Sequence, residues 1–372
     1  MVRIFGHVVV KPCQSVANGY MLNQMYNERV VDDGIAKAAV AYRTNFNKKS
    51  NINFSKWAFD KIKQLGKAYV MIGDFTNFFD NLDHAYLKQQ CCSLLRCDVL
   101  PNDYYSVFKS VTAYGVWELK DLLALNGLED TITGRKQLNR KKRVLTLQQF
   151  KENSSHIRKN MNHYGIPQGS PISAVLANVY MLEVDKHIND IVQTHGGMYM
   201  RYSDDFIAIV PVYNENNAVD ALKKMQDVID STPGLTLEPN KTQYFAYDKG
   251  SLKNSGKIFH ADSDDSKRFI NFLGFTFDGK QITIRAKTVS KYYYRMYRKA
   301  KNIVNSGYRT RKGNRISCRN LYQTYSERGA HGKRGNFLSY VARADKEYQN
   351  EKAITRDTRR HMRKIRKALN GK

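Results

Sequence analysis

Acidic residues and long hydrophobic runs are both scarce in this sequence of 372 residues. Asp and Glu number 34 against 61 Lys and Arg, a formal net charge of +27. An excess this large favours a polyanionic partner, with an anionic membrane surface as the competing interpretation. No apolar run approaches the roughly 20 residues that span a bilayer, and no segment has the features of a secretory signal peptide. We therefore expect a cytoplasmic protein that makes no membrane contact.

Cysteine is also sparse. The five cysteines are Cys13, Cys91, Cys92, Cys97 and Cys318. An odd number, with three in one expected helix, makes a poor disulfide framework and lacks the paired spacing of zinc ligands. We expect reduced thiols that pack in the interior. Aromatic residues make up 12% of the chain and hydrophobic residues 42%, which excludes a disordered chain.

The most informative stretch is MYMRYSDDFIAIV, residues 198–210. In its first part every second residue, Met198, Met200 and Tyr202, falls on one side of an expected strand. Its second part, from Phe206 to Val210, has the composition of a buried strand. The pattern predicts a β-hairpin whose tip carries Asp204 and Asp205. Two adjacent carboxylates repel each other, and a divalent cation would offset that repulsion. A surface turn that happens to hold Asp-Asp explains the same residues, so other segments must decide.

Two further segments carry distinctive residues. Residues 67–75, KAYVMIGDF, predict a strand that ends at Asp74, where a lone carboxylate among apolar neighbours is costly unless it is paired or bound to metal. Asp83 is predicted to cap the following helix. Residues 165–171, GIPQGSP, form a turn-rich loop before a long apolar helix, and Pro171 suits the first position of that helix.

In order and spacing, residues 74–80 (DFTNFFD), 165–171 and 198–210 resemble the reverse transcriptase family, over residues 40–300 of this chain. The resemblance implies an α/β (α+β) right-hand polymerase fold, with fingers, a palm of antiparallel sheet flanked by helices, and a basic helical thumb. The expected boundaries are 1–66 for the N-terminal part and fingers, 67–100 for the first part of the palm, 101–164 for an insertion, 165–285 for the palm with catalytic hairpin and primer grip, and 286–372 for the thumb.

The resemblance also implies nucleotide addition by phosphoryl transfer with two Mg²⁺ ions. Asp74, Asp204 and Asp205 would be the catalytic metal ligands, joined by the carbonyl of Phe75. Asp74 and Asp204 would be the main bridging ligands, and Asp205 a weaker or indirect one. Phe79 matches the aromatic residue that blocks a ribose 2′-hydroxyl, so the site should favour deoxynucleotides.

Further binding residues follow from the same resemblance. Those expected at the incoming nucleotide are Arg43, Lys49, Phe79, Gln168 and Lys241. Those expected at primer and template are Tyr202, Gly169, Leu273, Gly274, Arg295 and Arg298. Solvated surface charge is an alternative interpretation of Arg43 and of the lysines at 48 and 49, whose register stays open. An exposed lysine at a strand start is the alternative for Lys241.

From residue 286 onward the chain holds 25 Lys and Arg against 5 Asp and Glu, with four tyrosines within 292–297. This composition predicts a surface that grips the phosphates of a duplex. The tyrosines fit core packing or base stacking, with protein priming as an alternative. We also expect helices over 32–41 and 355–369, a basic loop over 134–143, and a hairpin that turns at Asp278-Gly279.

The leading hypothesis is an RNA-directed DNA polymerase that copies an RNA template, expected to be a structured non-coding RNA, into DNA from dNTPs. Residues 41–43, 49–51 and 335–340 resemble bacterial defence-associated and abortive-infection members, which implies an anti-phage role. Template-independent or homopolymer DNA synthesis by the same site is one alternative. A basic RNA-binding scaffold with a vestigial polymerase fold is another. A homo-oligomer or a second protein subunit is also compatible with the sequence.

Overall fold

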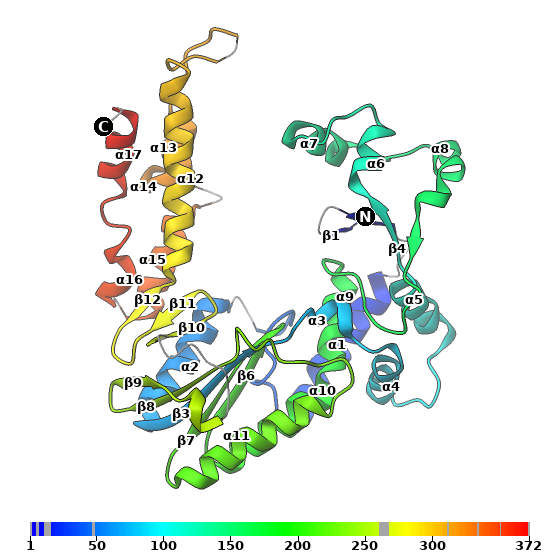
Figure 1. Ribbon diagram of the computed structural model, residues 1–372, viewed down its shortest axis with the longest axis vertical. Helices are drawn as coiled ribbons and strands as arrows, with labels where there is room; N and C mark the ends of the chain where they lie inside the picture. The colour runs from blue at the N-terminus through cyan, green and yellow to red at the C-terminus, as the bar shows by residue number, and fades with distance from the viewer. Residues whose placement is uncertain are drawn as a thin grey trace. The chain divides into compact units, whose positions relative to one another are not determined.

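The computed structural model describes residues 2–4, 7–10, 16–46, 49–259, 268–310, 312–332, 335–349 and 351–370. The chain has the expected mixed α/β architecture (Figure 1). It divides into two compact units, the first formed by residues 1–47, 73–208 and 220–242, and the second by residues 48–72, 209–219 and 243–372. Both units are therefore discontinuous in sequence, so neither corresponds to a single stretch of the chain.

The first unit is mainly helical. It holds β1 (Val2–Ile4), β2 (His7–Val10), α1 (Val16–Asp32), α3 (Phe78–Asn81), α4 (His84–Leu95), α5 (Asn102–Thr112), β4 (Gly115–Glu118), α6 (Leu119–Ala124), α7 (Ile132–Arg140), α8 (Leu147–Glu152), β5 (Arg158–Lys159), α9 (Pro171–Tyr180), α10 (Leu182–Thr194) and β6 (Met198–Tyr202). Helices α1, α4 and α9 pack together (Figure 1). Pro171 opens α9, and Asp83 caps α4 by accepting a hydrogen bond from the Tyr86 amide at 2.8 Å, so both predictions are confirmed.

The second unit holds the remaining elements. They are α2 (Asn51–Leu65), β8 (Gln243–Asp248), β9 (Ser251–Asn254), β10 (Ile270–Phe272), β11 (Phe275–Phe277), β12 (Ile282–Ile284), α12 (Ala286–Asn305), α13 (Arg319–Tyr325), α14 (Glu327–Ala330), α15 (Phe337–Glu347), α16 (Lys352–Arg356) and α17 (His361–Leu369). Strands β3 (Lys67–Asp74) and β7 (Asp205–Pro211) and helix α11 (Glu215–Asp230) run from one unit into the other.

The central sheet has five strands in the order β6-β7-β3-β8-β9. Strand β3 is antiparallel to β8, with Lys67 opposite Asp248 and Ile72 opposite Gln243. Residues 68–73 of β3 are buried without alternation, as in a strand that is covered on both faces. This burial fixes the register of β3, because a slip by one residue would exchange the faces of its side chains. The acidic end of β3 is thereby held in a defined position.

Each unit also contains one smaller sheet. Strands β1, β2, β4 and β5 form a four-stranded sheet, and Trp117 of β4 packs with Leu122 and Leu138 in a local core. Strands β10, β11 and β12 form a three-stranded antiparallel sheet. The predicted turn at Asp278-Gly279 is confirmed, because the Asp278 carboxylate accepts hydrogen bonds from the Lys280 and Gln281 amides between β11 and β12.

Three expectations of local structure are wrong. The helix expected over residues 32–41 ends at Asp32 as α1, and turns follow it. Most of the expected loop over 134–143 is helix α7, which Thr131 caps at its start. The single helix expected over 355–369 is two helices, because Asp357 lies in a break where its carbonyl accepts a hydrogen bond from the Tyr293 hydroxyl at 2.8 Å.

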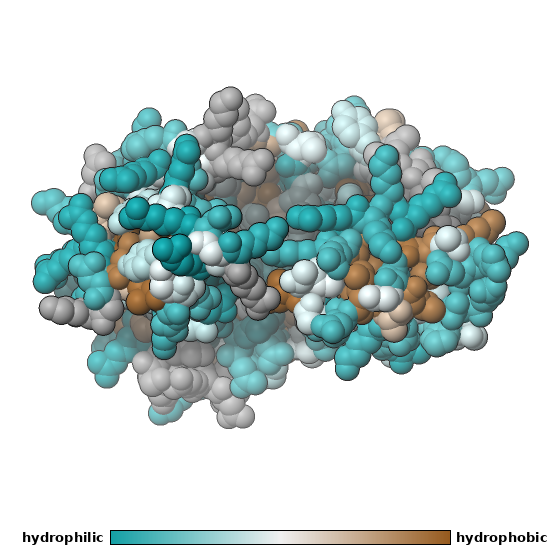
Figure 2. Space-filling model, turned by 90° about the horizontal axis from the view of Figure 1, so that it is seen from above, coloured by the Kyte–Doolittle hydropathy of each residue, from teal (hydrophilic) through white to brown (hydrophobic). Residues whose placement is uncertain are grey.

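The surface reflects the composition. Figure 2 shows a face on which hydrophilic side chains dominate and hydrophobic side chains form smaller areas. In the part of the chain that the structure describes, no helix combines the length and the apolar character needed to cross a bilayer. The described cysteines, Cys91, Cys92, Cys97 and Cys318, are free thiols as predicted, and Cys13 lies outside the described residues.

Candidate active site

The tip of the β6–β7 hairpin is a two-residue turn formed by Ser203 and Asp204. Ser203 has a φ of +65°, a left-handed conformation that costs energy for a residue other than glycine. Two contacts within the first unit hold it there. The Tyr42 hydroxyl lies 2.9 Å from the Ser203 hydroxyl, and Arg201 Nη1 donates a hydrogen bond to the Ser203 carbonyl at 2.8 Å. The turn that presents both aspartates is therefore fixed from two sides.

A buried ion pair anchors Arg201. Its Nη2 and Nε lie 2.6 and 2.8 Å from the two carboxylate oxygens of Asp185 on α10. Arg201 is 1% exposed and Asp185 is fully buried. Burial alone would lower the pKa of Arg201, but the charge and hydrogen bonds of Asp185 raise it above its usual value. Because the Tyr199 hydroxyl also donates to Asp185, at 2.9 Å, the guanidinium is held in a single orientation beneath the turn.

Asp74 lies at the end of β3, the strand next to β7 in the sheet. The preceding residue must be glycine, because a Cβ on Gly73 would lie 2.2 Å from the ring of Phe206 in β7. On the other side of Asp74, the Phe75 ring packs against the Phe206 ring with centroids 5.4 Å apart. Close packing of β3 on Phe206 thus brings Asp74 beside Asp205, the residue before Phe206.

Asp74 and Asp205 are close enough for their negative charges to interact. Desolvation and then repulsion by Asp204 and Asp74 raise the pKa of Asp205 to about 7. The Asp205 side chain is nevertheless exposed to solvent, so we attribute the raised pKa of Asp205 mainly to repulsion between the carboxylates. Lys241 Nζ lies 2.6 Å from Asp74 Oδ1, and this pairing raises the pKa of Lys241. Lys241 is thus paired with Asp74, while Asp204 and Asp205 add negative charge nearby.

These residues suit a magnesium site in charge and donor type. Magnesium takes hard oxygen ligands and needs only a few carboxylates, since water and phosphate supply the rest. The uncompensated repulsion at Asp205 is the kind that a divalent cation relieves. Among the residues that the structure describes, however, no three His, Cys, Asp or Glu side chains converge on one point. Whether Asp74, Asp204 and Asp205 hold metal ions together therefore stays a prediction.

The Phe75 carbonyl, predicted to bind metal, takes no part in the pairing with residues 236–238. Phe75 forms an antiparallel bridge with Leu237, in which the Glu238 amide donates to the Asp74 carbonyl at 2.8 Å and the Thr76 amide donates to the Thr236 carbonyl at 2.9 Å. In such a pair the carbonyl of the central residue points away from the partner segment. The oxygen of Phe75 is therefore directed away from residues 236–238.

The first unit holds two predicted nucleotide-binding residues, Phe79 and Gln168, and two predicted primer and template residues, Gly169 and Tyr202. Phe79 in α3 is 8% exposed, and its carbonyl accepts a hydrogen bond from the Ile166 amide at 2.8 Å. This bond ties α3 to the loop that presents Gln168 and Gly169, both of which are exposed. Gly169 has a φ of +87°, which favours glycine. Tyr202, half-buried at the end of β6, precedes the catalytic turn.

Other predicted residues have structural contacts of their own. Arg43 is half-buried, and its guanidinium donates to the carbonyls of Ala36 and Ala39 and to Asn27. Lys49 belongs to the second unit, where its Nζ lies 4.5 Å from the centre of the Trp57 ring. Whether either side chain also binds a nucleotide stays a prediction.

Four of the predicted primer and template residues lie in the second unit. Leu273 and Gly274 form the turn between β10 and β11, with φ angles of +48° and +89°. The Leu273 carbonyl accepts a hydrogen bond from Asn51 Nδ2 at 2.8 Å. Arg295 and Arg298 are exposed on α12, and the Arg298 guanidinium lies 5.6 Å from the centre of the Tyr294 ring.

Sequence analysis missed the residues that support the site. Asp185, Arg201 and Tyr42 received no role there, although together they fix the Ser203 turn. One signal was present, because an arginine inside a strand that is otherwise apolar needs a buried acidic partner. The partner itself, 16 residues earlier on α10, has no local pattern that points to it.

A comparison with curated proteins found no match. Comparisons with solved structures and with family models did find matches. Three of the similar solved structures are apo telomerase from Candida tropicalis (15% identity, TM-score 0.44, 95% of this chain and 52% of that chain), a form of it truncated from the C-terminal domain (15%, 0.41, 73% and 46%), and telomerase from Candida albicans with a fragment of telomeric RNA (15%, 0.40, 75% and 42%). The chain spans about half the length of each.

The family model for "Reverse transcriptase (RNA-dependent DNA polymerase)" matches residues 21–277, more than half of the 372 residues. The matched range contains α3, the GIPQGSP loop and the β6–β7 hairpin, the elements that bring Asp74, Gln168 and Asp205 into the first unit. The chain therefore belongs to the reverse transcriptase family.

Proposed function

We propose that this protein is an RNA-directed DNA polymerase whose catalytic carboxylates are Asp74, Asp204 and Asp205. The observation that carries the proposal is that Asp74 ends β3 and Asp205 begins β7, two neighbouring strands of the sheet, so that the negative charge of Asp74 raises the pKa of Asp205. Asp204 lies in the turn before Asp205, which a buried ion pair supports, and its charge acts in the same direction. A scaffold that only bound RNA would gain nothing from acidic side chains that repel one another at one sheet edge, since their repulsion reduces stability.

Two Mg²⁺ ions would be held by Asp74, Asp204, Asp205 and the carbonyl of Phe75. Bound there, they would supply the positive charge that lowers the pKa of the primer 3′-hydroxyl and neutralises the leaving pyrophosphate. Lys241 has a 60% exposed side chain, so it can exchange Asp74 for a phosphate oxygen of the nucleotide. Phe79, packed against the Phe78 ring, would form the wall that excludes a ribose 2′-hydroxyl.

The central test replaces Asp204 and Asp205 by alanine. We expect loss of Mg²⁺-dependent dNTP incorporation on an RNA template, measured by primer extension, with circular dichroism and RNA affinity unchanged. The matched control is D220A/D227A, which removes two exposed aspartates from α11 and should retain full activity. Synthesis that survives in the D204A/D205A variant would rule out the assignment of these residues.

The sugar preference has a test of its own. Phe79→Val opens space beside the GIPQGSP loop while keeping an apolar side chain. The ratio of dNTP to NTP incorporation should fall by about tenfold or more, because a wall of this kind discriminates by contact alone. An unchanged ratio would place the discriminating contact elsewhere.

We propose further that the template is a structured non-coding RNA and that the activity serves anti-phage defence. Two of the segments that resemble defence-associated members, residues 49–51 and 335–340, meet in the second unit, where Asn51 Nδ2 lies 3.0 Å from the Tyr340 hydroxyl. This contact supports a shared role for them. Sequencing of the RNA that copurifies and of the DNA product would distinguish templated copying from homopolymer synthesis, and phage plating on cells with the D204A/D205A variant would test the defence role.

A further inference from the structure

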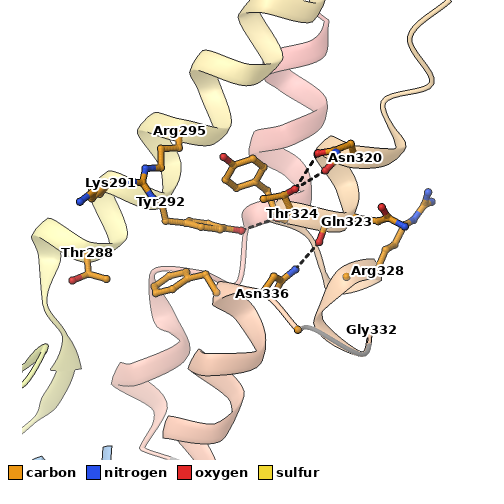
Figure 3. Close-up of a pocket in the computed structure, with 14 residues that line it drawn as sticks. Thr288, Lys291, Tyr292, Arg295, Asn320, Gln323, Thr324, Arg328, Gly332 and Asn336 are labelled. Atoms are coloured by element: carbon orange, nitrogen blue, oxygen red, sulfur yellow. Dashed lines mark hydrogen bonds between the residues drawn. The ribbon is translucent and has the colours of Figure 1, made fainter. Parts of the chain in front are cut away.

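A cavity of about 710 Å³ lies in the second unit, among α12, α13, residues 328–332 and residues 335–337. Figure 3 shows Tyr292 reaching from α12 toward Asn336, with Lys291 and Arg295 on the same helix and Arg328 on the opposite side. The volume is within the usual range of about 300–1,000 Å³ for small-molecule sites. None of the residues assigned to the catalytic hairpin lines this cavity.

Among the described residues, the charged side chains that line the cavity are all cationic. They are Lys291, Arg295 and Arg328, with no aspartate or glutamate. Lys291 and Arg295 are exposed, and neither has an ion pair or a side-chain hydrogen bond within the described part of the chain. Their charges are therefore available to an anion. Both are one turn apart on the same helix, a spacing that suits one phosphate group.

The floor of the cavity is aromatic and fixed. The Tyr292 ring lies 4.8 Å from the Phe337 ring and 5.6 Å from the Tyr325 ring, measured between centroids. The Tyr292 hydroxyl donates to the Tyr325 carbonyl at 2.6 Å, which holds the ring in place. Phe337 and Tyr325 remain half-buried, so part of each ring can still contact a ligand. A planar base would find an apolar face there.

The polar wall is also held in position. Asn336 Nδ2 donates to the carbonyls of Gln323 and Ser326 at 3.1 and 2.8 Å, and its Oδ1 caps α15. Gly329 packs so closely on Gln323 that a Cβ would lie 1.7 Å from that carbonyl oxygen. The side-chain amides of Asn320 and Gln323 are exposed; Asn320 Oδ1 accepts from Lys299 and Thr324, so Asn320 offers its Nδ2 donors, while Gln323 offers a donor and an acceptor. The cavity thus combines fixed walls with exchangeable polar groups.

The geometry points to a binding site for one unpaired nucleotide of a nucleic-acid strand, with its phosphate at Lys291 and Arg295 and its base on the Phe337 ring. A duplex could not place a base in a concave site between three helices, because its bases are stacked and paired. This site would add a contact to single-stranded nucleic acid beyond the polymerase site. It does not depend on the proposed catalytic residues.

Binding is tested with the full-length chain and fluorescein-labelled (rU)12, with anisotropy as the readout and no dNTPs present. K291A/R295A should weaken binding about tenfold more than K287A/K301A, which removes two exposed cations from the same helix outside the cavity. Equal losses for the two pairs would overturn the proposal, because general electrostatics would then explain the affinity. Thermal unfolding of each variant separates lost binding from lost folding.

The contribution of the aromatic floor is tested with a second pair of variants. F337L should weaken (rU)12 binding about fivefold, whereas F150L, in the first unit, should leave it within twofold. Incorporation of one 4-thiouridine should give photocrosslinks to residues 319–337, and crosslinks confined to the exposed Tyr294 would overturn the site.

Two further probes define the ligand. Equal affinity for (dT)12 supports a site for any unpaired nucleotide, and a preference for (rU)12 supports one for RNA. Free UMP that binds as tightly as (rU)12 would overturn the strand-binding proposal. Because D204A/D205A should bind (rU)12 like the wild type, failure of the polymerase proposal would leave this result unaffected.

Discussion

At the scale of single residues, the Ser203-Asp204 turn depends on a charge pair that is buried from water. Asp185→Asn keeps the shape of the side chain but leaves the Arg201 guanidinium, 1% exposed, without a counter-charge. Removing one partner of a buried pair costs about 3–5 kcal/mol. We expect the free energy of unfolding, measured by urea denaturation, to fall by that amount, and primer extension to fall with it because the Ser203 carbonyl loses its fixed donor.

The control for this prediction is Asp220→Asn. Asp220 pairs with Lys224 at 2.8 Å on α11, but both side chains are more than half exposed, so the pair should contribute under about 1 kcal/mol. Similar losses in the two variants would mean that the Asp185–Arg201 pair does not support the turn.

Gly73 provides a second prediction at this scale. In Gly73→Ala the new Cβ would lie 2.2 Å from the Phe206 ring, which is completely buried. Overpacking of this kind costs about 1–3 kcal/mol and would displace β3 near Asp74. We expect lower stability in urea denaturation and weaker dNTP incorporation. Adding Phe206→Leu should recover part of both, because the smaller side chain makes room, and a double variant no better than G73A would contradict the steric explanation.

At the scale of elements, the β10–β11 turn depends on helices that are distant in sequence. Asn51 of α2 donates to the Leu273 carbonyl, and its amide also contacts the Tyr340 hydroxyl of α15. Asn51→Ala should release a turn in which Leu273 holds a φ of +48°, lowering the free energy of unfolding by about 1–2 kcal/mol. Primer extension should weaken if this turn contacts the primer. Tyr340→Phe removes one hydroxyl and should cost less, and the reverse order would contradict this account.

The elements also show what local sequence can predict. The 198–210 hairpin, the Asp83 cap and Pro171 at the start of α9 depend on neighbouring residues, and their patterns were sufficient. The break between α16 and α17 depends instead on Tyr293, 64 residues before Asp357. The contacts of Arg43 depend on backbone carbonyls in the turns that follow α1. Asp74 and Asp205 were predicted to meet from a family resemblance. The ion pair that holds the Ser203-Asp204 turn joins α10 to β6, and neither a local pattern nor the family resemblance predicted it.

At the scale of the whole molecule, the charge is distributed unevenly. Residues 286–372 carry 25 Lys and Arg against 5 Asp and Glu, whereas the catalytic carboxylates lie in the first unit. Five exposed cations lie on α12 alone, at Lys287, Lys291, Arg295, Arg298 and Lys301. This division separates the acids of the proposed chemistry from the cations that would hold nucleic acid, so the two functions can be varied independently.

The salt dependence of duplex binding tests whether the α12 cations, and not the acidic residues, determine the affinity for nucleic acid. If Lys287, Arg298 and Lys301, the exposed α12 cations outside the cavity, each contact a phosphate of a 20-base-pair RNA–DNA duplex, the slope of log K against log salt should be about −2.7, a loss of about 40-fold between 50 and 200 mM NaCl. K287A/K301A should reduce the slope to about −0.9, and D204A/D205A should leave it unchanged, because aspartates release no cations from the duplex. Anisotropy titrations over this range are sufficient. A slope near zero would mean that apolar contacts hold the duplex, and a slope that K287A/K301A does not alter would assign the phosphate contacts to cations outside these positions of α12.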